Sequence, residues 1–76
     1  MTEYRIFSEF ADDREKGGYE TYGIAAYVSG EFIRAVRDIS TDKSAVSELV
    51  RLFNKEELSI LHLDIAIEDF LYDHEE

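Results

Sequence analysis

The spacing of apolar residues changes once along this chain, close to Ser40. Before that point apolar side chains alternate with polar ones, as at Tyr4, Ile6 and Phe10, which is the period of a strand with one buried face. After it they recur every three or four residues, which is the period of a helix with one buried face. The sequence therefore predicts an α+β fold in which the strands come first and the helices last.

Three strands and two helices account for most of the chain. Strands are predicted over residues 3–10, 19–28 and 31–39, and helices over residues 42–54 and 59–72. Residues 11–18 are rich in Asp, Glu, Lys and Gly, so they are predicted to form a solvated loop. Ser29-Gly30 suits a two-residue hairpin turn. We expect a three-stranded antiparallel meander with both helices packed on one face of the sheet (βββαα).

The length of the Ser29-Gly30 turn decides which side chains face the helices. With two residues in the turn, Tyr27 lies opposite Phe32 and Ala26 opposite Ile33. A three-residue turn with a bulge at Gly30 would shift the register by one residue and exchange the two faces, and this alternative stays open. With the shorter turn, the helix-facing side carries Ile24, Ala26, Val28, Ile33 and Ala35. Gly23 is expected to mark a bulge or a close packing contact.

Capping residues delimit the two helices. One of Ser40, Thr41 and Asp42 is expected to cap the first helix, and Ser59 the second. Asn54 suits the C-terminus of the first helix, because asparagine tolerates a left-handed cap. The helices are predicted to share a core with Ile24, Ala26 and Ile33, to which they contribute Val46, Leu49, Val50, Phe53, Leu63, Ile67, Phe70 and Leu71.

The length and the lack of cysteine limit the class of protein. A chain of 76 residues has room for one domain with one core, so residues 1–76 are expected to form a single domain. Without cysteine there are no disulfides or thiolate metal sites, and this usage favours a cytoplasmic location. The first residues lack the features of a signal peptide, and no apolar run is longer than 24–28. Neither export nor a membrane span is expected.

The charge is strongly negative and unevenly distributed. The chain carries 18 acidic and 8 basic side chains, for a net charge of −10. Residues 56–76 contain eight of the acidic residues and no lysine or arginine. Because this charge opposes binding to a phosphate backbone or an anionic membrane, we expect neither nucleic acid nor membrane as a partner.

The titratable residues form no recognisable catalytic or metal-binding pattern. His62 and His74 stand too far apart on one helix to hold a metal together. Carboxylates are spaced four residues apart in two pairs, Asp64 with Glu68 and Asp69 with Asp73. A calcium site, however, needs a loop that supplies six to eight oxygens, and the sequence has none. We therefore expect no metal, no cofactor and no enzymatic activity.

Three blocks of the sequence resemble a small bacterial family of unknown function. They are Tyr22-Gly23-Ile24, Asp38-Ile39-Ser40-Thr41-Asp42-Lys43, and His62-Leu63-Asp64 followed by Ile67-Glu68-Asp69-Phe70-Leu71. The resemblance extends from about Tyr4 to Leu71. It implies a short cytoplasmic protein of βββαα order, and it assigns no activity and no functional residue. The Ser-Thr-Asp-Lys block is explained by helix capping alone, since a phosphate loop would require glycines.

The excess of aromatic residues favours a protein-interaction or accessory module. The first 32 residues contain seven aromatic side chains, which is more than one face of a three-stranded sheet can bury. The predicted interaction surface is the sheet face opposite the helices, with Tyr27, Phe32, Arg34 and Val36. Its partner would be another protein or a second copy of the chain.

Two other function classes remain as alternatives. The acidic segment 56–76 could present carboxylates where a nucleic acid presents phosphates, and so inhibit a basic protein. A small-molecule-binding or enzymatic domain is the third hypothesis, and it predicts that a ligand or metal raises the melting temperature.

Overall fold

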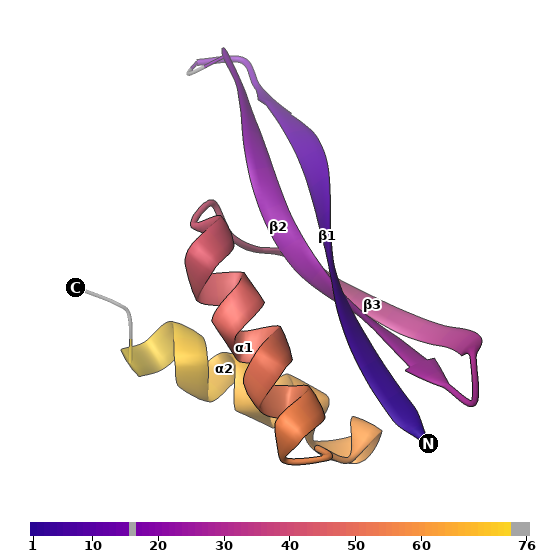
Figure 1. Ribbon diagram of the computed structural model, residues 1–76. Helices are drawn as coiled ribbons and strands as arrows, with labels where there is room; N and C mark the ends of the chain where they lie inside the picture. The colour runs from indigo at the N-terminus through magenta and orange to yellow at the C-terminus, as the bar shows by residue number, and fades with distance from the viewer. Residues whose placement is uncertain (16, 74–76) are drawn as a thin grey trace.

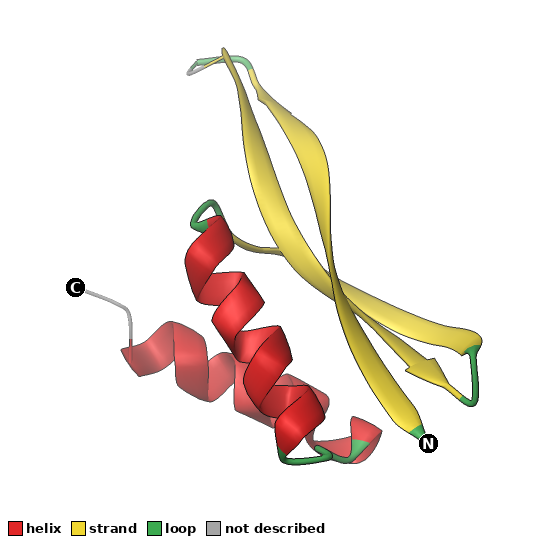
Figure 2. Ribbon diagram, in the orientation of Figure 1, coloured by secondary structure: helices red, strands yellow, loops and turns green. Residues whose placement is uncertain are grey.

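The computed structural model describes residues 1–15 and 17–73. Its elements are β1 (Thr2–Asp13), β2 (Gly17–Val28), β3 (Glu31–Ser40), α1 (Lys43–Lys55), a short 3₁₀ helix η1 (Ile60–His62) and α2 (Leu63–Asp73). The strands form one antiparallel sheet in the order β1-β2-β3 (Figure 1). The helices lie together on one side of this sheet (Figure 2). The predicted α+β class and βββαα order are confirmed.

The hairpin of β1 and β2 is longer than predicted. Its strands pair without a register shift from Thr2 with Val28 to Asp13 with Gly17, so the prediction of a solvated loop over 11–18 is wrong. The far end of this hairpin projects beyond the helices (Figure 1). Both of its faces are therefore open to water, and charged residues can occupy a strand there without being buried.

The turn between β2 and β3 has two residues, as predicted. Ser29 and Gly30 adopt φ angles of 52° and 83°, the left-handed backbone that a tight hairpin turn of this kind requires. Tyr27 pairs with Phe32, which confirms the register next to the turn. The alternative with a three-residue turn is therefore wrong.

Beyond Phe32 the register departs from the prediction. Ala26 pairs with Arg34 rather than with Ile33, and Ile24 pairs with Val36. Ile33 is the extra residue of a β-bulge, which shifts the side chains that directly follow it, including Arg34, Ala35 and Val36, to the opposite face.

The bulge changes which residues of β3 enter the core. Ile33 is 47% exposed, and Ala35 pairs with Ala25 on the face away from the helices, so placing these two in the core was wrong. Val36 instead packs against the core, and Ile39 is buried within it. The prediction that Ile24 and Ala26 belong to the core is confirmed.

A second irregularity of β3 lies opposite Gly23. The register shifts between Tyr22 and Ile24, and Asp38 adopts a φ of 53° on the opposing segment. A side chain at position 23 would collide with the carbonyl oxygen of Val36 and with the ring of Phe7. Both predicted roles of Gly23, a bulge and a close contact, are confirmed.

Helix α1 begins with a side-chain cap. The Asp42 carboxylate accepts a hydrogen bond from the Ala45 N–H at 3.3 Å, and Ser40 Oγ accepts one from the Asp42 N–H at 3.0 Å. The left-handed residue after the helix is Glu57 (φ 51°), so assigning that role to Asn54 was wrong. Ser59 caps as predicted, with its Oγ accepting from the Leu61 N–H, but the helix that it caps is η1.

The core forms between α1, α2 and the helix-facing side of the sheet. The predicted contributions of Val46, Leu49, Phe53, Leu63 and Ile67 are confirmed, whereas Leu71 is largely exposed. Val50 and Phe70 lie at its margin. Tyr4, which the alternation in the first strand placed on the buried side, is fully buried and meets Phe53 edge to face at 5.6 Å between ring centroids. Phe10 was placed on the same side but is 72% exposed, because it lies on the projecting end of the hairpin.

No helix among the described residues is both long enough and apolar enough to cross a bilayer.

Candidate interaction surface

The open face of the sheet, meaning the side turned away from the helices, carries an exposed aromatic pair. Tyr27 and Phe32 meet edge to face, with 5.7 Å between ring centroids and 72° between ring planes. Phe32 exposes 56% of its surface, and the neighbouring bulge residue Ile33 exposes 47%. This cluster of apolar side chains lies next to the tight turn at Ser29 and Gly30.

Arg34 and Val36, the other two residues predicted for this surface, lie on the helix side of the sheet. Arg34 donates two hydrogen bonds to Asp64 on α2, at 3.0 Å to Oδ2 and 2.7 Å to Oδ1. Val36 packs against the core. The bulge at Ile33 causes both displacements, because it reverses the alternation of side chains over the part of β3 that contains Arg34 and Val36.

Two residues of β1, Glu3 and Arg5, extend the open face beside the aromatic pair, although sequence reasoning did not assign them to it. The guanidinium of Arg5 lies over the ring of Tyr27, 4.3 Å from its centroid. It also donates to the Glu3 carboxylate at 3.1 Å, which holds the pKa of that carboxyl below its ordinary value. The alternation of side chains in β1 could have indicated both residues, since positions 3 and 5 share one face of the strand.

The charges at the other end of this face are also paired. Arg37 on β3 donates to the Glu9 carboxylate on β1 at 2.8 Å. Hydrogen bonding to that carboxylate raises the pKa of Arg37. Between the two ion pairs, Phe7 lies against Gly23. The open face therefore carries the aromatic pair and the Glu3–Arg5 ion pair at the end near the turn, Phe7 in the middle, and the Glu9–Arg37 ion pair at the other end.

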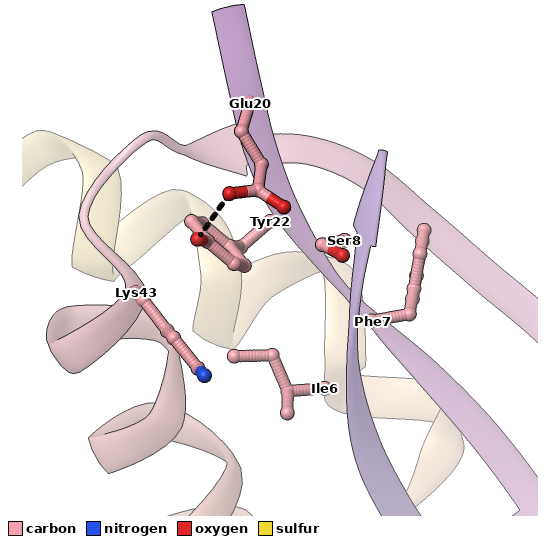
Figure 3. A pocket seen from close by; sticks show the side chains of 6 residues that line it. All are labelled: Ile6, Phe7, Ser8, Glu20, Tyr22 and Lys43. Carbon is pink, nitrogen blue, oxygen red and sulfur yellow. Dashed lines mark hydrogen bonds between the residues drawn. The ribbon is translucent and has the colours of Figure 1, made fainter. Parts of the chain in front are cut away.

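A shallow hollow of about 330 Å³ lies between the hairpin and the start of α1 (Figure 3). Its lining includes Lys43, Glu20 and Tyr22. The hydroxyl of Tyr22 donates to the Glu20 carboxylate at 3.0 Å, and this hydrogen bond raises the pKa of Tyr22. The amino group of Lys43 points toward the space between Tyr22 and Ile6 (Figure 3). These groups offer one cation and a phenol that is hydrogen-bonded to a carboxylate. Because the pKa of Tyr22 is raised, this hydrogen bond does not favour ionisation of the phenol to a nucleophile.

The titratable residues singled out in the sequence do not meet at one point. His62 is exposed on η1, Asp64 is engaged by Arg34, and Glu68 is exposed on α2. His74 and the side chain of Asp73 lie outside the described residues. Within residues 1–15 and 17–73, no three side chains of His, Asp or Glu form a group that could hold a metal ion.

A protein-family model described as "Family of unknown function (DUF6514)" matches residues 1–73. This match confirms the expected relation to a family of unknown function. The chain matches no curated protein and no solved structure.

Proposed function

We propose that this chain, which belongs to the family of unknown function DUF6514, is a protein-interaction module that binds its partner through the open face of the sheet. The observation that supports the proposal most is the exposure of Phe32 and Ile33 beside Tyr27, on the side of the sheet turned away from α1 and α2. A solvated sheet face is ordinarily polar, whereas an apolar patch on a small domain is typical of a binding surface.

The composition of the open face supports the same function. Aromatic and arginine side chains are enriched in the centres of protein interfaces, and here Tyr27, Phe32 and Arg5 lie together. The Glu3 carboxylate, paired with Arg5, borders this centre, and the Glu9–Arg37 pair lies farther along the same face, so both would form part of a polar rim. Because these charges are already neutralised within the chain, a partner need not supply compensating charges. The lack of cysteine supports the cytoplasm as the place where this binding occurs.

Replacement of Phe32 tests the proposal. We expect Phe32→Glu to leave the far-UV circular dichroism and the melting temperature nearly unchanged, because the side chain lies outside the core. The same substitution should lower the apparent mass in sedimentation, if the partner is a second copy, or abolish partner capture from an extract of the native cell. A charge placed at the centre of an interface opposes desolvation, so the loss should be nearly complete.

Phe10→Glu is the matched control. Phe10 is 72% exposed on the projecting hairpin, so this variant introduces the same charge at an exposed phenylalanine outside the aromatic cluster. It should retain both the mass and the capture of wild type. If Phe32→Glu also retains both, the open face is not the binding surface. If Phe32→Glu unfolds the chain, Phe32 belongs to the core and the register of β3 described above is incorrect.

A further inference from the structure

The outer side of α2 carries a second set of exposed apolar residues. Leu61 at the end of η1 is 84% exposed, and Ile65 and Tyr72 on α2 are 60% and 76% exposed. We call these three residues the outer stripe. These residues were not identified from the sequence, because the periodicity of this helix was already explained by the residues assigned to the core.

The spacing of the outer stripe aligns its residues along the helix axis. Ile65 and Tyr72 are two turns apart, and Leu61 lies about one turn before Ile65. The buried residues Leu63 and Ile67 lie on the opposite side of the helix and face the core. Helix α2 therefore has two apolar sides, and the described part of the chain covers only the side that carries Leu63 and Ile67.

Acidic side chains border the outer stripe. Glu68 and Asp69 stand between Ile65 and Tyr72, and both are exposed. Within the described part of the chain, neither of them forms an ion pair, whereas Asp64 is engaged by Arg34. Residues 56–73 contain no lysine or arginine that could neutralise them. The apolar surface is thus surrounded by uncompensated negative charge.

We propose that the outer stripe binds a basic amphipathic helix of a partner protein. The partner's apolar side chains would pack along Leu61, Ile65 and Tyr72, and its lysine or arginine residues would meet Glu68 and Asp69. A second copy of this chain is a poor occupant, because it would place the acidic residues of both copies against each other. This site lies on a different element from the open face and takes a partner of different chemistry, so it goes beyond the function proposed above.

A designed peptide tests this binding. The probe is a helical peptide of leucine and lysine whose leucines recur at i, i+3, i+4 and i+7, and its scrambled version has the same charge without an apolar face. Titration into ¹⁵N-labelled protein should shift the amide signals of residues 61–72, and the scrambled peptide should bind at least about tenfold more weakly. Glu68→Gln with Asp69→Asn should weaken binding and reduce its dependence on salt, since the variant removes charge and keeps shape.

Serine substitutions separate apolar from purely electrostatic binding. Leu61→Ser with Ile65→Ser should lower the affinity for the peptide about tenfold or more, with an unchanged melting temperature, because both side chains are exposed. Phe32→Ser, on the open face, should keep wild-type affinity for the peptide. The proposal is overturned if Leu61→Ser with Ile65→Ser binds the peptide as wild type does, or if the amide shifts map outside residues 61–72. It is also overturned if the same serine variant abolishes a dimer of this chain, because the outer stripe would then bind a second copy. The test of the open face with Phe32→Glu is independent of all these results, so the two proposals can fail separately.

Discussion

At the scale of single residues, the side chain of Asn54 connects α1 to the edge of β1. Its Oδ1 accepts from the Tyr4 N–H at 2.8 Å, and its Nδ2 donates to the Tyr4 carbonyl at 2.9 Å. An amide side chain has the same donor and acceptor as a peptide unit, so Asn54 occupies the edge of β1 as a neighbouring strand would. The hydroxyl of Tyr4 in turn donates to the Leu58 carbonyl at 2.7 Å. Position 4 is thereby fixed to both ends of the segment 54–58.

Removing the Asn54 side chain should weaken this connection measurably. We expect Asn54→Ala to lower the free energy of unfolding by about 1–2 kcal/mol, because two partly buried backbone groups of Tyr4 lose their partners. Asn54→Asp should cost at least as much at neutral pH, since it sets a carboxylate oxygen against the Tyr4 carbonyl. Urea denaturation measures both, with Lys55→Ala as the control at the neighbouring exposed position. Equal stability of Asn54→Ala and Lys55→Ala would contradict this role.

At the scale of elements, α1 determines the packing of the domain. It contacts all three strands, and it contributes Val46, Leu49 and Phe53 to the core. Helix α2 is tied to the sheet at its start, where Leu63 is buried and the Arg34–Asp64 ion pair joins it to β3. That pair is exposed, so it adds little stability and mainly orients the two elements.

Among the side chains of α1, we expect Phe53 to contribute most to the stability of the fold. Phe53→Ala should cost about 3–5 kcal/mol, which is comparable to the whole stability of a domain of this size, because it leaves a cavity beside Tyr4. Thermal denaturation followed by circular dichroism measures this loss. Leu52→Ala on the same helix should cost far less, since Leu52 is substantially exposed. A Phe53→Ala variant that melts within a couple of degrees of wild type would refute the described core.

At the scale of the whole molecule, the excess of negative charge opposes compaction. The net charge is −10 on 76 residues, and residues 56–76 lack lysine and arginine. The ion pairs seen among the described residues are all at least partly exposed, so they compensate little of this repulsion. The folded chain is therefore stabilised by its core against its own charge.

Screening this charge should raise the stability. We expect the melting temperature at neutral pH to increase by several degrees between about 20 mM and 500 mM NaCl, where the Debye length falls from roughly 20 Å to a few ångströms. Excess EDTA at fixed ionic strength should leave the melting temperature unchanged. A decrease with EDTA that one divalent cation reverses, and that is absent in Glu68→Gln, would show that a metal site rather than general screening governs stability.

The order of the elements, the turn between β2 and β3 and the start of α1 followed from the sequence because they depend on near neighbours. The change of apolar period near Ser40 separated strands from helices, and the backbone preferences of Ser29-Gly30 gave the turn. Asp42 was among the expected caps because a cap acts over three residues. Periodicity also identified Phe53 and Leu63 as core residues without any knowledge of what they would contact.

The side of the sheet on which each residue of β3 lies was decided only in the tertiary structure. The bulge at Ile33 has no mark in the local sequence, since it depends on how β3 fits against β2 and the helices, and it moved Arg34 and Val36 away from the predicted surface. The pairing of Arg34 with Asp64 and of Asn54 with Tyr4 spans 30 and 50 residues, respectively. Contacts of that separation exist only after the chain has closed on itself, so no local propensity encodes them. Of the four residues predicted for the candidate surface, only Tyr27 and Phe32, directly beside the turn, lie on the open face.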